Sequence, residues 1–232
     1  MNPLPKLFAA AALAAALVPA GAATFDFANL KYNNGINSGF LPTDGIACTG
    51  GDLCSSNVDG GMRNGDLTFS SVGITVAATG QFNNAVAAAV QDHENGYSAQ
   101  NKIGAGLGVY HQSGNTSDDN ITVGETLIMS FSQLVHLTGI SLRSEGHNVS
   151  GWTANSTFLF NGANRLLPIG SGDIALDLTG TQFTFAYGGG SADQFYLSGL
   201  TATAVPEPGT MALMLAGLAA VGFTARRRRA VR

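Results

Sequence analysis

The middle of the chain alternates apolar and polar residues in short runs, which clusters of Gly, Asn, Asp and Ser separate. In the run at 125–143, Leu127, Met129 and Phe131 share one side of an extended chain and leave the intervening residues on the other side. One apolar and one polar face are typical of antiparallel strands joined by turns. We expect strands within 24–30, 67–81, 106–110, 125–143, 157–160, 174–178, 182–187 and 194–204.

This pattern predicts an all-β protein with one folded domain at 23–204. About eight or nine strands, with no long amphipathic helix among them, favour a single β-sandwich of the jelly-roll kind. We expect Gly139 to split the run at 125–143 into two strands. The segment 83–90 (NNAVAAAV) is the helix candidate of this domain, although it is also compatible with a strand or an irregular segment.

Both ends of the chain differ from this domain. Residues 1–22 combine a positive Lys6, an apolar run at 7–18, and the small residues Ala20, Gly21 and Ala22, which form an A-x-A cleavage site. These parts, in this order, predict a secretory signal peptide. A short N-terminal membrane anchor is the alternative.

The C-terminal segment 205–232 has three parts in a fixed order. Pro206, Glu207 and Pro208 end the folded domain, because proline fits neither a helix interior nor a sheet interior. An apolar, helix-compatible segment follows at 210–225. As a helix it would be about 24 Å long, so it would cross a hydrocarbon core of about 30 Å only where the bilayer is locally thinned. The cluster Arg226, Arg227, Arg228 and Arg229 would then stay on the cytoplasmic side. A buried core helix, a GPI signal and a permanent anchor are the alternatives.

This order of Pro-Glu-Pro, apolar helix and arginine cluster resembles the PEP-CTERM sorting signal, a tail that is also labelled the ice-binding protein C-terminal domain. The resemblance implies recognition by an exosortase, a membrane-embedded transpeptidase or protease, through Pro206, Glu207 and Pro208. It implies export through the inner membrane, transient membrane anchoring, and then a cell-surface or extracellular location. It gives no indication that the domain at 23–204 binds ice.

The segment 106–148 also resembles a recurring jelly-roll domain of PEP-CTERM proteins. The shared features are a Gly-x-Gly-Val strand, an acidic turn followed by Ile and Glu, and a Leu-x-Leu-x-Phe strand. The matching residues here are Gly106, Gly108, Val109, Asp119, Ile121, Glu125, Leu127, Met129 and Phe131. This resemblance implies a fold and no reaction.

Charge is distributed unevenly along the chain. Residues 23–204 hold five Lys and Arg against fourteen Asp and Glu, a balance of 5 − 14 = −9. An acidic domain is unsuited to nucleic acid, since binding requires cations that neutralise phosphates. Cys48 and Cys54 flank a short Gly-containing loop, and in an oxidising compartment we expect a disulfide between them.

Two clusters are candidates for a site. Asp118, Asp119, Asn120 and Glu125 offer hard oxygen ligands of the kind that Ca²⁺ prefers, although they do not match EF-hand spacing and also suit a solvated turn. Asp92-His93-Glu94 places an imidazole between carboxylates, but neighbours on a strand point to opposite faces. No Gly-x-Ser-x-Gly or His-Glu-x-x-His motif occurs, so we expect no catalytic residues.

These observations favour a non-catalytic surface or matrix protein associated with exopolysaccharide. A calcium-stabilised carbohydrate-binding module and a secreted glycan-active hydrolase are the alternatives. The hydrolase would need two facing carboxylates, for which the candidates are Asp92, Glu94, Asp119, Glu125 and Glu145. An ice-binding surface would need a regular threonine array, and the sequence has no repeat that builds one.

Overall fold

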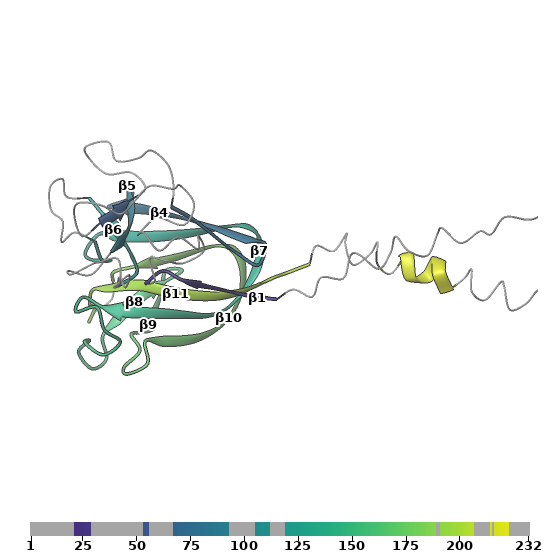
Figure 1. The fold of residues 1–232 in the computed structure, drawn as a ribbon. Coiled ribbons are helices and arrows are strands. Elements are labelled where there is room, and N and C mark those ends of the chain that lie inside the picture. Colours follow the sequence, from purple (N-terminus) through teal and green to yellow (C-terminus); the bar gives the residue numbers. More distant parts are fainter. Residues whose placement is uncertain are drawn as a thin grey trace, which may run out of the picture. The chain divides into compact units, whose positions relative to one another are not determined.

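The computed structural model describes residues 21–28, 53–55, 67–92, 105–111, 119–188, 191–206, 214 and 216–222. The chain divides into two units, one formed by Ala22–Ala204 and the other by Met1–Gly21 with Val205–Arg232. All described strands belong to the first unit (Figure 1). The prediction of an all-β chain is confirmed.

The strands follow one another with no helix between the described elements. They are β1 (Ala22–Asp26), β2 (Leu53–Ser55), β3 (Leu67–Ser71), β4 (Ile74–Phe82), β5 (Ala85–Asp92), β6 (Leu107–Tyr110), β7 (Glu125–Ser144), β8 (Thr157–Phe160), β9 (Ala163–Leu166), β10 (Asp173–Ala186) and β11 (Phe195–Ala204).

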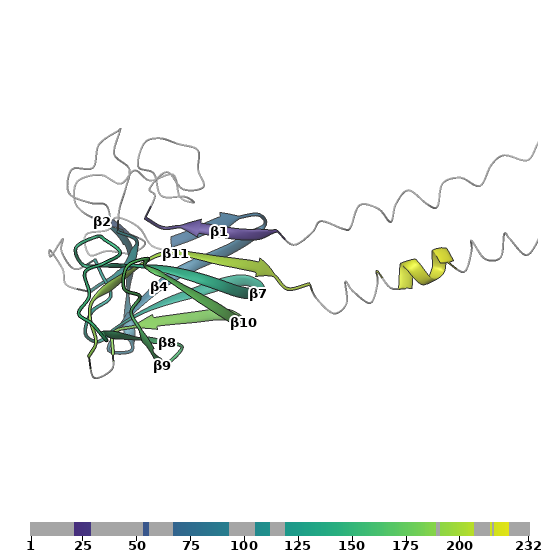
Figure 2. The ribbon, with the colours of Figure 1, turned by 90° about the horizontal axis from the view of Figure 1, so that it is seen from below.

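One hydrogen-bonded sheet connects these strands in the order β1-β11-β6-β5-β4-β7-β10-β8-β9, with β2 on β5 and β3 on β4. The long strand β7 organises it. One edge of β7 pairs with β10 along most of its length, whereas the other edge pairs with β4 over 125–131 and with β11 over 135–144. Because β11 also joins β6, the pairings return to β7 and enclose a common interior. β7 and β10 bend strongly around this interior in Figure 1, and Figure 2 shows the same strands from below.

Alternation along each strand supplies the core. In β7 the residues Leu127, Met129 and Phe131 are buried, as the sequence pattern predicts. Phe131 packs edge-on against Phe25 of β1 and Phe183 of β10, with ring centroids 6.3 and 5.8 Å apart. Full burial of one such side chain contributes about 2–3 kcal/mol, so these rings hold strands together that are far apart in the sequence.

Of the alternatives that the sequence left open for 83–90 the strand is found, and three other expectations about element boundaries are wrong. The helix candidate at 83–90 forms a turn and the strand β5, because Asn83 and Asn84 take positive φ angles of 49° and 65° and reverse the chain. Sheet pairing outweighs the helix propensity of alanine there. The run at 67–81 is a hairpin whose turn is Val72-Gly73, with φ angles of 49° and 78°.

Gly139 does not split β7, since it pairs with Thr201 on one side and Ala175 on the other and keeps the strand continuous. The separate strands expected at 174–178 and 182–187 are likewise joined, as β10. The pairing of β10 with β7 absorbs the irregularity through register shifts between Ala175 and Leu178 and between Gly180 and Gln182.

The Gly-x-Gly-Val feature has a steric explanation. A Cβ atom on Gly108 would lie 1.8 Å from the carbonyl oxygen of Asp119, and one on Gly106 would lie 2.5 Å from that of Leu197. Gly106 also has a φ of 139°, which disfavours any other residue. Both glycines let neighbouring backbones pass close to β6.

The second unit is described only at Gly21, 205–206, 214 and 216–222, the last of which is helical. In the described part of the chain, no helix has the length and apolar character required to cross a membrane. Several predicted features lie outside the described residues: residues 1–20 of the signal peptide predicted at 1–22, Cys48, Glu207, Pro208, most of the helix at 210–225, and Arg226 to Arg229. For Cys54 the structure describes only the backbone, in β2.

Candidate functional site

The predicted acidic cluster lies where the segment before β7 crosses β6 and β11. Asp119, Asn120 and Glu125 are buried, with 6%, 4% and 1% of their surface exposed, while Asp118 lies outside the described residues. The solvated turn that the sequence also suggested is therefore wrong for these three residues. Each of them contacts a different partner.

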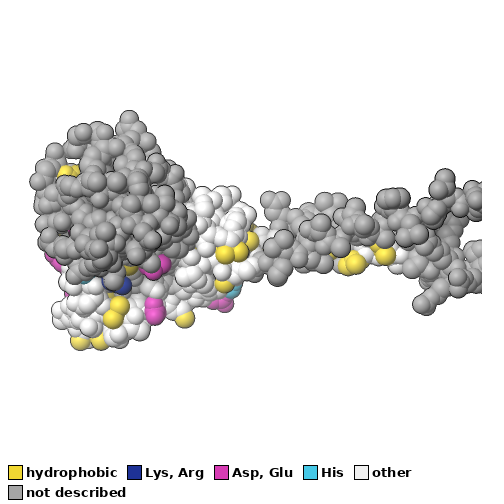
Figure 3. Space-filling model, viewed as in Figure 1, with side chains coloured by type: hydrophobic (Ala, Val, Ile, Leu, Met, Phe, Trp, Pro, Cys, Tyr) yellow, Lys and Arg dark blue, Asp and Glu magenta, His cyan; other side chains and the backbone are white. Residues whose placement is uncertain are grey.

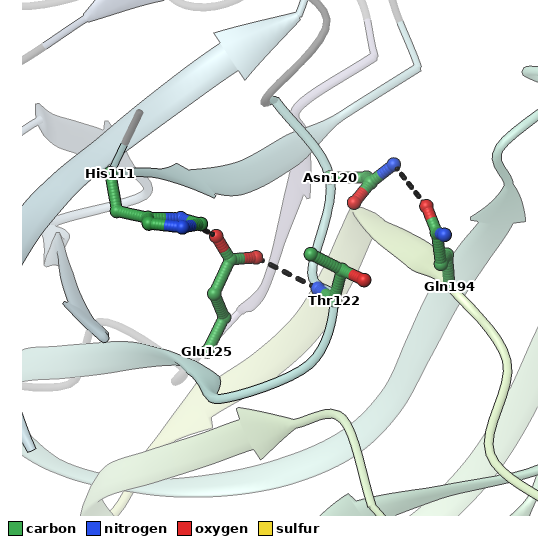
Figure 4. Close-up of polar contacts among 5 residues, drawn as sticks. All are labelled: His111, Asn120, Thr122, Glu125 and Gln194. Atoms are coloured by element: carbon green, nitrogen blue, oxygen red, sulfur yellow. Dashed lines mark hydrogen bonds and ion pairs between the residues drawn. The ribbon is translucent and has the colours of Figure 1, made fainter. Parts of the chain in front are cut away.

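Glu125 forms the most enclosed polar arrangement of this region (Figure 4). Its Oε1 atom lies 2.7 Å from Nδ1 of His111, and its Oε2 atom accepts a hydrogen bond of 2.8 Å from the Thr122 backbone N–H. The imidazole of His111 stacks on the ring of Phe82, with centroids 3.7 Å apart and an interplanar angle of 9°. Both carboxylate oxygens of Glu125 thus have protein partners that fix the turn at the start of β7.

The other two residues connect this segment to β11. Tyr196 donates from its hydroxyl to Oδ1 of Asp119 over 2.7 Å, and Nδ2 of Asn120 donates to Oε1 of Gln194 over 2.8 Å. The backbone N–H of Val109 donates to the Asn120 carbonyl over 2.9 Å. The region ties β6, β7 and β11 together.

Calcium at Asp118, Asp119, Asn120 and Glu125 stays a prediction. Within the residues that the structure covers, no three His, Cys, Asp or Glu side chains gather in a way that could hold a metal ion. The backbone of Asp92 is described at the end of β5, whereas His93 and Glu94 lie outside the described residues.

A groove of about 320 Å³ lies on the outer face of β1, β11, β7 and β10. Residues from the four strands line it in register, because Asp26 pairs with Gly199, Gly199 with Ser141, and Ser141 with Asp173. Directly paired residues of antiparallel strands point to the same face, so these four form one row across the sheet. The neighbouring row places Thr24 and Thr201 beside the groove.

Small residues make the floor of the groove and polar side chains form its walls. Gly199 offers no side chain, and a Cβ atom there would lie 2.9 Å from the Phe25 carbonyl oxygen. Asp26 and Asp173 are exposed and Arg143 is half-buried, and all three line the groove together with Val149. Figure 3 shows how few charged side chains the described surface carries in one view.

Hydrogen bonds orient the polar groups of the groove. Ser141 donates from Oγ to Oδ1 of Asp173 over 2.5 Å, and Oδ1 of Asp26 accepts from the Ala28 backbone N–H over 3.2 Å. Arg143 donates from Nη1 to the His147 carbonyl over 3.3 Å. The sequence analysis missed this groove, since its residues lie at 24–28, 141–149, 171–173 and 198–201 and only the strand pairing brings them together.

The C-terminal motif begins where β11 ends. Ala204 is the last residue of β11 and pairs with Val135, and Val205 and Pro206 follow without regular structure. Proline lacks the N–H that would continue a sheet ladder, which explains the end of the strand at this point.

Comparison with known proteins identifies this segment. Residues 204–229 match a family profile described as the PEP-CTERM protein-sorting motif. The motif is found where the sequence analysis predicts it, and it indicates an exported protein that an exosortase sorts. Neither the curated proteins nor the solved structures include a match to the chain.

Proposed function

We propose that this chain, an exosortase-sorted exported protein with a PEP-CTERM motif, is a non-catalytic surface or matrix protein whose domain binds exopolysaccharide. The exported destination is where extracellular polysaccharide is found. The groove on β1, β11, β7 and β10 is the observation that carries the proposal. It accepts an extended ligand along a surface that is polar but weakly charged.

The groove offers the chemistry that a sugar hydroxyl needs. Carboxylates of Asp26 and Asp173 accept hydrogen bonds from hydroxyls, and the guanidinium of Arg143 donates to hydroxyl or ring oxygens. Hydroxyls of Thr24 and Ser141 do both. A neutral or weakly anionic polysaccharide presents alternating donors and acceptors, which this mixed set complements.

The spacing of the carboxylates supports binding over hydrolysis. Asp26 and Asp173 belong to strands separated by three inter-strand steps, so their backbones are about 14 Å apart at the usual strand spacing. Glycoside hydrolysis requires two carboxyl groups about 5–9.5 Å apart across the scissile bond.

We further propose that the domain is a variant of the jelly-roll sandwich. The two halves of β7 exchange β4 for β11 as a neighbour, and buried residues of both halves belong to one core. Strong bending of β7 and β10 gives two walls around that core, which supports this assignment (Figure 1).

A glycan array with the chain shortened to residues 22–206 tests the binding proposal. We expect binding to one or more bacterial polysaccharides, and a loss of about tenfold or more in affinity for Asp173→Asn, because a charged hydrogen-bond acceptor is removed. Asp177→Asn is the matched control, since Asp177 lies on the same strand, is exposed, and does not line the groove. Absence of binding to any glycan, or equal affinity of the Asp173→Asn protein, would contradict the proposal, as would release of reducing ends from a bound polysaccharide.

Replacing Pro206, Glu207 and Pro208 with alanine in the full chain tests sorting separately. We expect the altered protein to be retained in the membrane fraction instead of reaching the surface or the medium. Unchanged location and size would refute the role of this motif.

A further inference from the structure

The domain sends its two ends out on the same side. Ala22 at the start of β1 pairs with Thr203 near the end of β11, and the two strands are antiparallel. The sorting segment therefore leaves the domain beside the point where the exported domain begins (Figure 1). If the sorting segment is anchored, the end of the domain nearest to the anchor is the one where β1 starts and β11 ends.

Two further segments reach this end of the domain. One is the turn between β3 and β4 at Val72-Gly73. Close to this turn, Thr75 donates from its backbone N–H to Oγ of Ser132 over 3.3 Å, and Ser132 lies in the part of β7 that approaches the end of β11. The middle of β7 at 132–134 follows, between Phe131, which pairs with Val76, and Val135, which pairs with Ala204. Figures 1 and 2 agree in placing the beginning of β4 on the side where β1 starts and β11 ends.

Val72 is an unusual residue for its position. Three described hairpins have two-residue turns in which both residues have positive φ: Val72-Gly73, Asn83-Asn84 and Asn161-Gly162. Asparagine tolerates this conformation and opens the other two turns, whereas a β-branched valine is strained in it. Val72 is also 66% exposed, so burial in the domain does not compensate the strain. The turn requires a positive φ at this position, but it does not require a valine there. A strained residue that is exposed on the surface points to a contact outside the domain.

The segments around Val72 carry no charged residues of their own, and the exposed carboxylate beside this end, that of Asp177, is paired with His136 at 2.6 Å. The segments 71–73, 132–134 and 203–204 contain no Asp, Glu, Lys or Arg, although residues 23–204 as a whole carry a balance of −9. Leu134 adds a second exposed apolar side chain, at 43%. An acidic domain held against an anionic bilayer is repelled least through an end whose own segments are uncharged.

We infer that this end, defined by residues 71–73, 132–134 and 203–204, is a membrane-facing surface whose Val72 and Leu134 side chains contact the lipid interface. The inference rests on the sorting role of the C-terminal segment. Five residues lie between Ala204 and the start of the apolar segment at Thr210, and the six steps of chain span at most about 20 Å. The domain is thus too closely tethered to leave the neighbourhood of the bilayer while the apolar segment is embedded.

Tryptophan fluorescence in lipid vesicles tests the inference with the full chain. The protein is reconstituted in phosphatidylcholine–phosphatidylglycerol vesicles with or without brominated acyl chains, which quench tryptophan at the interface. We expect the Val72→Trp protein to show at least about twofold more quenching than the Val86→Trp control. Val86 is an 89% exposed valine at the other end of β4, beside the Asn83-Asn84 turn.

A second pair of variants covers the case in which tryptophan disrupts the Val72 turn. Leu134→Trp is expected to be quenched and Ile169→Trp, at a 66% exposed position beyond β9, is expected not to be. Equal quenching within both pairs, in chains that co-float with the vesicles, would overturn the membrane-facing surface and favour a protein partner at this end. Failure of the full chain to co-float would instead refute the anchoring by the sorting segment on which the inference rests.

Discussion

Replacement of Gly108 by alanine is the sharpest test of how β6 is packed. The added Cβ would lie 1.8 Å from the carbonyl oxygen of Asp119 and 2.7 Å from Cα of Asn120. Both are backbone atoms, so a side-chain rotation cannot relieve the contact. Either β6 or the segment at 119–121 has to move, and the movement would break the 2.9 Å hydrogen bond from Val109 N–H to the Asn120 carbonyl.

The expected cost has two parts. Overpacking of a well-packed core costs about 1–3 kcal/mol, and leaving a buried backbone donor unsatisfied costs about 1–3 kcal/mol more. We therefore expect Gly108→Ala to lower the free energy of unfolding by about 2–6 kcal/mol. For a small domain of marginal stability this loss is sufficient to unfold a large part of the population at 37 °C.

Urea denaturation of the chain shortened to residues 22–206 measures this difference. Gly139→Ala is the matched control, because Gly139 is also a strand glycine but its Cβ would meet only the Ile174 carbonyl oxygen, at 3.6 Å. The control should remain within about 1 kcal/mol of the original protein. If Gly108→Ala and Gly139→Ala unfold at the same urea concentration, the close approach of the Asp119 backbone to β6 is wrong.

Three other changes have defined outcomes. Tyr196→Phe removes the buried hydrogen bond to Asp119 and should lower the free energy of unfolding by about 1–3 kcal/mol. Tyr187→Phe loses a hydrogen bond of 3.3 Å at a half-buried site and should lower it by less. A larger loss for Tyr187→Phe than for Tyr196→Phe would contradict these contacts. Val72→Asn should raise the free energy of unfolding by about 1 kcal/mol by relieving the strained turn, and a decrease would argue against that strain. EDTA should leave the thermal midpoint unchanged, since both Glu125 oxygens already accept or share hydrogen bonds with protein groups, and a fall of several degrees would establish a calcium site.

The sequence was informative about the strands for a physical reason. Alternation of apolar and polar residues directly reports which side of a strand is buried, and Leu127, Met129 and Phe131 face the core as expected. Turns were harder to predict where the residue type contradicts the conformation. Val72 has none of the properties of a turn residue, so the sequence predicted one strand where there is a hairpin. The alanines after Asn84 left a helix, a strand and an irregular segment open, and sheet pairing selects the strand.

The candidate sites were less accessible to sequence reasoning. Asp119 and Glu125 were identified as members of a cluster that suits either calcium or a solvated turn. Their burial involves Tyr196 and His111, which nothing in the local pattern connects to them. The groove depends on the register of four strands, and a shift of one residue in any of them would remove a lining side chain to the other face. In contrast, the sorting motif is local in the sequence and needed no tertiary information.

The position of β11 also has a mechanical consequence for a protein attached through its C-terminus. A load applied to the tail acts on Ala204, along the axis of a strand that β7 borders on one side and β1 on the other. Such a pull slides β11 past both neighbours and strains many hydrogen bonds at once, whereas a pull across the strand would open them one after another. Flow of the surrounding medium past an anchored domain would therefore pull on β11 along its axis, the direction in which the domain resists unfolding most strongly.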